Sequence, residues 1–149
     1  MNNEEFETMQ NFIREGGSLQ MLADIDKKDM DTLYQYAVQL VECKDTEAAR
    51  NIFYLLWRMD TWNYDYCFSL GLTCQQLKEH FEAIYCFARA GTIQVDNPFP
   101  SYHAGLSYKA VANEEYAKRS FKASLRWSNK RPEYIDVAVN AQQELDALA

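Results

Sequence analysis

The chain is poor in residues that break helices, with three prolines and five glycines among its 149 residues. It also has few cysteines, and no two of them have the CxxC spacing that is typical of metal and redox sites. We therefore interpret the four, Cys43, Cys67, Cys74 and Cys86, as reduced thiols rather than as a disulfide framework. An apolar content of 48% with so few breakers favours a helical globular domain that buries one core.

The sequence has no long apolar run either. The longest, residues 52–57, is too short to span a bilayer, and the opening MNNEEFETMQ lacks the basic and apolar regions of a signal peptide. We expect a cytoplasmic protein without stable membrane insertion. The 15 basic residues are outnumbered by 22 acidic ones, which gives a net charge of -7, so the average surface repels phosphate and nucleic acid is not an expected partner.

Catalytic signatures are scarce. There are two histidines, His80 and His103, and no HExxH, GxSxG or glycine-rich phosphate loop. Cys74, His80 and Cys86 are spread too widely for a metal site. His103 could face a groove, although a partly exposed polar contact is the interpretation we favour. We predict that the protein is not an enzyme and needs no cofactor or metal.

An internal repeat organises most of the chain. Shifting the sequence along itself until Tyr34 falls on Phe68 superposes aromatic, small and aliphatic residues over three copies without a gap. The matched sets are Tyr34, Phe68 and Tyr102; Ala37, Gly71 and Gly105; Val38, Leu72 and Leu106; Ala49, Ala83 and Ala117; and Phe53, Phe87 and Phe121.

These ladders resemble the tetratricopeptide repeat, whose period is about 34 residues. In that repeat a small residue lets two antiparallel helices approach, and an aromatic residue fills the wedge between hairpins. Cys67 and Cys74 stand where the pattern expects larger apolar residues. The fold class is then all-α, a short superhelix of three helical hairpins. We expect helices at about 29–43, 45–59, 64–78, 81–92, 98–111 and 114–127.

Helical segments flank the three repeats. We assign residues 29–131 to the repeats, 1–28 to an N-terminal helical segment and 132–149 to a helix that caps the superhelix and begins at Pro132. The N-terminal segment carries an apolar stripe, ended by Gly16 and Gly17, and then a second short stripe. The stripe residues are Phe6, Met9, Phe12 and Ile13, then Leu19, Leu22 and Ile25.

The first helix of each repeat carries residues that we expect to line a concave groove. They form an aromatic row (Tyr34, Phe68, Tyr102), an aliphatic row (Val38, Leu72, Leu106) and border residues (Val41, Gln75, Lys109). Such rows are often simply core. We favour a groove, because the small-residue and Phe53 ladders already satisfy the packing and leave these rows without a partner in their repeat. An extended apolar segment would fit there, with tyrosine hydroxyls available to its backbone.

The three repeats and the segments that flank them resemble the class II type III secretion chaperones. The segments that carry the resemblance are Gly16 to Leu22, Leu33-Tyr34-Gln35-Tyr36-Ala37 and Arg131-Pro132-Glu133. The resemblance covers nearly the whole chain. It implies a bacterial cytoplasmic chaperone that binds hydrophobic translocator proteins without ATP and keeps them soluble and competent for secretion. It also implies that the two rows are client contacts and the border residues edge them.

The same resemblance implies a homodimer formed through the N-terminal helices, with Phe6, Met9, Phe12, Ile13, Leu19 and Leu22 as the candidate interface. An alternative is a tetratricopeptide scaffold that joins stable partners. A further alternative is a regulatory adaptor that binds a transcription activator. A client that is insoluble alone and absent from the final assembly would indicate a transient chaperone rather than a scaffold.

Overall fold

The computed structural model describes residues 3, 4, 7, 10 and 26–149. The candidate dimer interface, Phe6, Met9, Phe12, Ile13, Leu19 and Leu22, lies outside the described residues. From residue 26 onward the chain is helical, as the all-α prediction requires. The helices are α2 (Lys27–Glu42), α3 (Thr46–Met59), α4 (Tyr64–Gln76), α5 (His80–Ile93), α6 (Pro98–Ala110), α7 (Glu114–Ser128) and α8 (Ile135–Leu148), with a short 3-10 helix η2 (Pro132–Tyr134) before α8.

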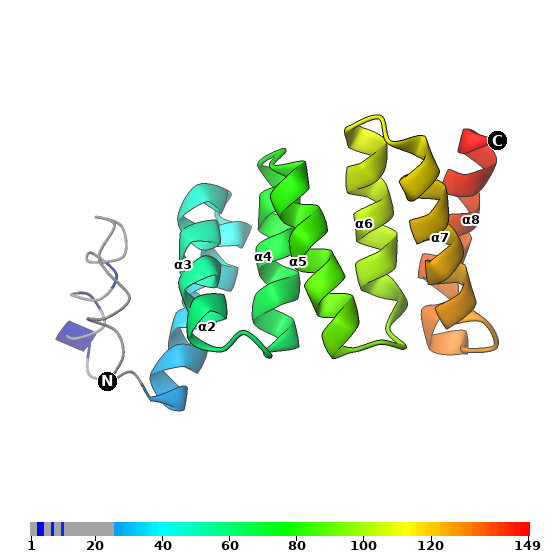
Figure 1. Ribbon diagram of the computed structural model, residues 1–149. Helices are drawn as coiled ribbons and strands as arrows, with labels where there is room; N and C mark the ends of the chain where they lie inside the picture. The colour runs from blue at the N-terminus through cyan, green and yellow to red at the C-terminus, as the bar shows by residue number, and fades with distance from the viewer. Residues whose placement is uncertain (1–2, 5–6, 8–9, 11–25) are drawn as a thin grey trace.

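The helices follow one another in a single row, and each packs against the next along the chain (Figure 1). Three antiparallel hairpins result, α2 with α3, α4 with α5 and α6 with α7, and α8 covers the exposed side of the last one. The ends of the six repeat helices fall within two residues of those predicted. Pro132 begins η2 rather than α8 itself. Across the described residues, no helix is long and apolar enough to cross a membrane.

Asparagine and aspartate side chains begin four of these helices. Asp26, Asn63, Asn97 and Asn113 each accept a hydrogen bond from a backbone N–H in the first turn, at 2.9 to 3.2 Å. Each bond satisfies one of the amides that a helix start leaves without a partner. Asn63 and Asn97 occupy the same position in successive repeats, so the start of α4 recurs at the start of α6.

The turn inside each hairpin is also repeated. Lys44, Lys78 and Ala112, which occupy matching positions in the three repeats, have positive φ angles of 65°, 62° and 62°. The next backbone N–H donates to the carbonyl five residues earlier, at 2.8 or 2.9 Å, which is the bond of a Schellman cap. Three hairpins therefore use one turn geometry, and none of them uses the glycine that this geometry favours.

In the second and third hairpins a small residue contacts a phenylalanine, as the ladders predicted. A Cβ added to Gly71 would lie 2.7 Å from the Phe87 ring, and one added to Gly105 would lie 2.6 Å from the Phe121 ring. Both phenylalanines are almost wholly buried. Ala37 takes the corresponding place in the first hairpin and is fully buried.

The cysteines are free thiols. Cys43 is exposed, whereas Cys67, Cys74 and Cys86 are buried between α4 and α5, so Cys86 joins the two that the pattern had placed in the core. The Cys67 thiol donates to the Cys86 carbonyl at 3.1 Å. Burial raises the pKa of Cys67 to about 11, so this thiol stays protonated at neutral pH.

Candidate functional site

The aromatic row lies half-buried along the first helices of the three hairpins. Each ring of the row contacts the buried phenylalanine of its own hairpin, so the premise that the row has no partner in its repeat was wrong. The contacting pairs, with the distances between ring centroids, are Tyr34 and Phe53 at 5.4 Å, Phe68 and Phe87 at 5.7 Å, and Tyr102 and Phe121 at 5.9 Å. Further rings cover part of the row, since Phe68 stacks on Tyr64 at 5.4 Å and Tyr34 lies 5.7 Å from Tyr66. Each ring of the row is thus partly core and keeps only part of its surface open to solvent.

A pocket of about 180 Å³ lies between α2 and α4, beside this row. Val38 and Val41 line it from α2, and Leu72 lines it from α4. The structure thereby brings together one border residue and two members of the aliphatic row. Phe53 of the phenylalanine ladder lines it as well, and the remaining lining residues, which sequence reasoning did not single out, are Glu42, Ser69, Thr73 and Gln76. Leu106 packs instead against the cluster formed by α7 and α8.

The hydroxyl of Tyr34 is already engaged. It lies 2.9 Å from the Ser69 hydroxyl, across the step from α2 to α4. A tyrosine hydroxyl both donates and accepts, so one role remains for a bound segment. The Tyr34 hydroxyl is therefore less available to a bound backbone than the sequence suggested.

His103 lies among aromatic rings rather than in a polar contact. Its ring is 5.5 Å from Phe68, 5.6 Å from Phe87 and 5.2 Å from Tyr102, measured between centroids. Nδ1 is buried and has no hydrogen-bond partner in the described part of the chain. Burial lowers the pKa of His103 to about 4, so the imidazole is neutral at physiological pH. His103 joins the second and third members of the aromatic row.

Two border residues are occupied by contacts within the protein. The Gln75 amide donates to the His103 carbonyl at 2.9 Å and to the Ser107 hydroxyl at 2.8 Å, which ties α4 to α6. Lys109 pairs with Glu144 of α8 at 2.7 Å. Both residues therefore join helices at the edge of the rows, which spacing alone could not reveal.

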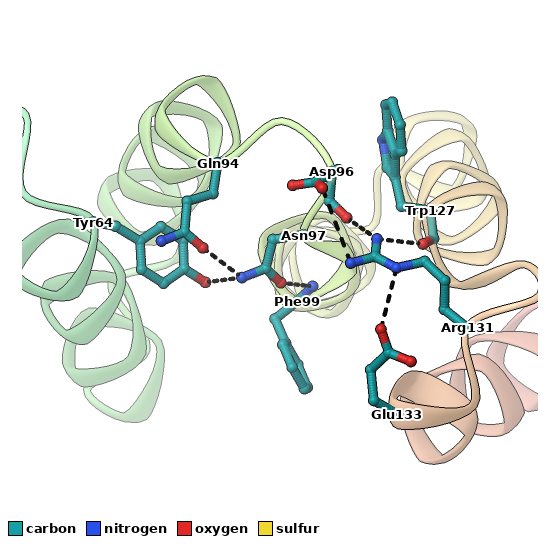
Figure 2. A network of polar contacts seen from close by, with 8 residues as sticks. All are labelled: Tyr64, Gln94, Asp96, Asn97, Phe99, Trp127, Arg131 and Glu133. Atoms are coloured by element: carbon teal, nitrogen blue, oxygen red, sulfur yellow. Dashed lines mark hydrogen bonds and ion pairs between the residues drawn. The ribbon is translucent and has the colours of Figure 1, made fainter.

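A polar network braces the loop between α5 and α6 (Figure 2). Asn97 donates to the Tyr64 hydroxyl and to Gln94, both at 3.0 Å. Arg131 donates to the backbone carbonyls of Asp96 and of Trp127, the latter at 2.9 Å. The guanidinium also lies 3.5 Å from the Glu133 carboxylate. The network joins α4, α6 and the start of η2.

The second helices carry a larger pocket, of about 590 Å³, between α3 and α5. Tyr54, Trp57, Phe81 and Tyr85 supply its aromatic walls. The search of the sequence for a binding surface followed only the first helix of each repeat and missed this one. In the described residues no cluster of three or more histidine, cysteine or acidic side chains could hold a metal ion.

Three comparisons with known proteins bear on this arrangement. No family model matches the chain. Among curated proteins it is similar to the low calcium response locus protein H of Yersinia pseudotuberculosis, with 23% identity over 142 residues that cover 94% of this chain and 83% of that protein. Among solved structures it is similar to the type III secretion translocator chaperone SycD of Yersinia enterocolitica, with a TM-score of 0.77, 20% identity and coverage of 89% and 98%.

It is also similar to PcrH of Pseudomonas aeruginosa, in complex with the chaperone-binding region of PopD, with a TM-score of 0.80, 18% identity and coverage of 84% and 94%. A further structure of SycD is described as an alternative dimer. At these identities the structural likeness shows the fold. The resemblance to type III secretion chaperones is confirmed, because the structural neighbours include a type III secretion translocator chaperone.

Proposed function

We propose that this chain is itself a translocator chaperone of type III secretion, and that it binds hydrophobic translocator proteins through the rows on α2, α4 and α6. The observation that carries the proposal is the pocket walled by Val38, Val41 and Leu72 in a fold shared with chaperones solved together with translocator segments. Burying one aliphatic client side chain in such a pocket contributes about 1.5 to 3 kcal/mol. A few such contacts suffice for stable capture.

In this proposal the client lies as an extended segment along the aromatic and aliphatic rows. Tyr34, Phe68 and Tyr102 offer the exposed parts of rings that otherwise pack against buried phenylalanines, so the contact surface is rigid. Rigid aromatic surfaces lose little conformational entropy on binding. Gln75 and Lys109 act chiefly as braces beside the rows. Covering an aggregation-prone segment lowers the concentration of its free form, so no catalysis, cofactor or ATP is needed.

The N-terminal segment, residues 1–28, is proposed as the dimerisation arm, with residues 29–131 as the client-binding repeats and 132–149 as the cap. The apolar stripe of Phe6, Met9, Phe12 and Ile13 supports an interface, since a stripe of this size is seldom left in water. The alternative dimer described for SycD supports a homodimer. The proposed setting is the bacterial cytoplasm, where translocators are held before export.

The test is co-expression of the chain with a hydrophobic translocator encoded near it, followed by size-exclusion recovery of a soluble complex. The double variant Val38→Thr and Leu72→Gln makes the pocket polar while preserving side-chain size. The matched control, Val139→Thr and Ile135→Gln, makes the same kind of change at exposed positions of α8. We expect wild type and control to yield the complex and the pocket variant to lose it, because unpaired polar groups oppose an apolar client.

A pocket variant that retains the complex would move the client site elsewhere, and a wild type that yields no complex would contradict the chaperone function and favour the scaffold. Phe68→Asp should also weaken the complex. Because Phe68 packs on Phe87 and His103, that variant must be accompanied by a stability measurement.

A further inference from the structure

The positive charge of this acidic chain is concentrated near one end of the row of helices. Six of the 15 basic residues fall between positions 118 and 131, a stretch without any acidic residue, although the net charge is -7. Most of that stretch is α7. The six are Lys118, Arg119, Lys122, Arg126, Lys130 and Arg131. We call Arg119, Lys122 and Arg126 the basic row, because their spacing of three and four residues places them on one outward face of the helix.

The basic row is exposed, and most of it has no internal partner. Arg119 pairs with Glu115 at 2.8 Å on the same helix, where both side chains are well exposed. Lys122 and Arg126 have no ion pair with any residue that the structure describes. Their charges are therefore available to a partner.

A mainly apolar pocket of about 380 Å³ lies beside the basic row, between α5 and α7, and residues of α6 also line it. Arg119 of the basic row is itself one of the lining residues. From α7, Ala123 and Trp127 line it, each one position after a member of the row. The opposite wall is apolar and comes from α5 and the residues that follow it. That wall is formed by Ile84, Ala88, Gly91 and Val95. Val95 is 60% exposed, a large value for an aliphatic side chain.

We propose that this cleft, an apolar pocket with a basic row along one wall, is a second docking site whose occupant is an acidic amphipathic helix of another protein. The apolar face of such a helix would enter between Ala88 and Trp127. Its carboxylates would meet Lys122 and Arg126. Charge complementarity selects the partner, because the rest of this acidic surface repels the same helix.

A polyanion without an apolar face matches the cleft less well. Nucleic acid would use the basic row and leave the pocket empty, while the net charge of -7 opposes its approach. The site also differs from the client rows, because its two walls come from the second helices α5 and α7, and the α6 residues that line it do not belong to those rows. A partner bound here leaves the pocket between α2 and α4 open.

The experiment measures fluorescence anisotropy of a labelled synthetic peptide of roughly five helical turns, with leucines at three- and four-residue spacing and glutamates elsewhere. A peptide of the same composition in permuted order and a short DNA duplex are the comparison probes. The protein is the full chain. Lys122→Glu with Arg126→Glu reverses the basic row, and Ala88→Trp fills the pocket from an exposed helix position.

The matched control is Lys44→Glu with Lys78→Glu, two exposed lysines in the hairpin turns, which changes the net charge by the same amount. We expect the basic-row variant to bind the amphipathic peptide about ten-fold or more weakly than wild type, and the control to stay within about two-fold. Ala88→Trp should weaken binding about five-fold. The permuted peptide and the DNA should bind more weakly than the amphipathic peptide.

Four results would overturn the proposal. They are no binding of the amphipathic peptide by wild type, equal losses in the basic-row variant and the control, no effect of Ala88→Trp, or DNA binding as tight as that of the peptide. The last result would instead indicate a general site for polyanions. Far-UV circular dichroism of each variant establishes that a loss of binding is not a loss of fold.

Discussion

Replacing Gly105 by alanine tests the packing rule on which the hairpins rest. The new methyl would lie 2.6 to 2.8 Å from three atoms of the Phe121 ring, well inside the roughly 3.5 to 4.0 Å of favourable carbon contact. Phe121 is fully buried, so its ring cannot move into solvent. Either the ring or the helices must shift, and both responses disturb the contact between α6 and α7.

Two opposing terms set the magnitude. Alanine has a better helix propensity than glycine by about 1 kcal/mol. Overpacking a filled core costs about 1 to 3 kcal/mol, and a clash with a rigid buried ring belongs at the upper end of that range. We expect a net loss of about 1 to 2 kcal/mol. Ala37, which holds a methyl at the same place in the first hairpin, indicates that the fold itself survives.

The assay is thermal and urea unfolding followed by far-UV circular dichroism. Gly105→Ala should lower Tm by roughly 2 to 8 °C. The matched control is Gly91→Ala, where the new methyl would meet nothing closer than Pro100 at 3.8 Å, so the gain in propensity should raise Tm by roughly 2 to 4 °C. Shortening the ring side chain with Phe121→Leu should recover part of the loss in the Gly105→Ala background. A Gly105→Ala variant as stable as wild type would refute the reasoning.

Three further outcomes follow from local geometry. Ala112→Gly should stabilise the protein by about 0.5 to 1 kcal/mol in urea unfolding, because relief of the positive φ outweighs the added freedom of the unfolded chain; a loss would contradict the turn assignment. The pKa of His103 is about 4 in the folded protein and about 6.5 in the unfolded chain. The free energy of unfolding is therefore unaffected by this group above pH 6.5, and it falls by up to about 3 kcal/mol as the pH drops to 4. Urea unfolding of wild type and of His103→Phe at pH 6.5 and pH 4 should show a smaller loss of stability in the variant. An equal loss in both proteins would argue against a buried, neutral His103. Arg131→Ala should cost about 1 to 3 kcal/mol, because the Asp96 and Trp127 carbonyls lose a charged donor, and Arg131→Lys should restore only part of it; full recovery with lysine would mean that charge alone matters.

The fold could be predicted because its determinants are local and repeated. Gly71 and Phe87 recur one repeat later as Gly105 and Phe121, and each pair is in contact in the structure. Helix ends could be placed within two residues, since polar caps and turns interrupt the apolar period at regular places. The resemblance to the secretion chaperones rested on the flanking segments as well as the ladders.

The details of the rows could not be predicted, because they depend on how neighbouring hairpins meet. Spacing places Lys109 beside Gln75 on matching faces, but only the stacked structure shows that Lys109 reaches Glu144 and that Gln75 binds the His103 carbonyl. The same applies to the clefts between the second helices, whose walls come from residues in successive repeats. Periodicity identifies the residues on one face of a helix, but it does not determine which residues of two neighbouring helices line a pocket together.

Packing from neighbour to neighbour along the row of helices has a consequence for motion. Because most contacts join adjacent helices, the free energy of local unfolding can differ from one hairpin to the next. Unfolding of a hairpin at one end therefore need not spread to the other end. Amide exchange should be slowest in α4 and α5, which have a hairpin on each side (Figure 1). Local opening between α2 and α4 could then load or release a client while α7 and α8 stay folded. Capture at one end of the molecule and docking at the other would be kinetically separate events.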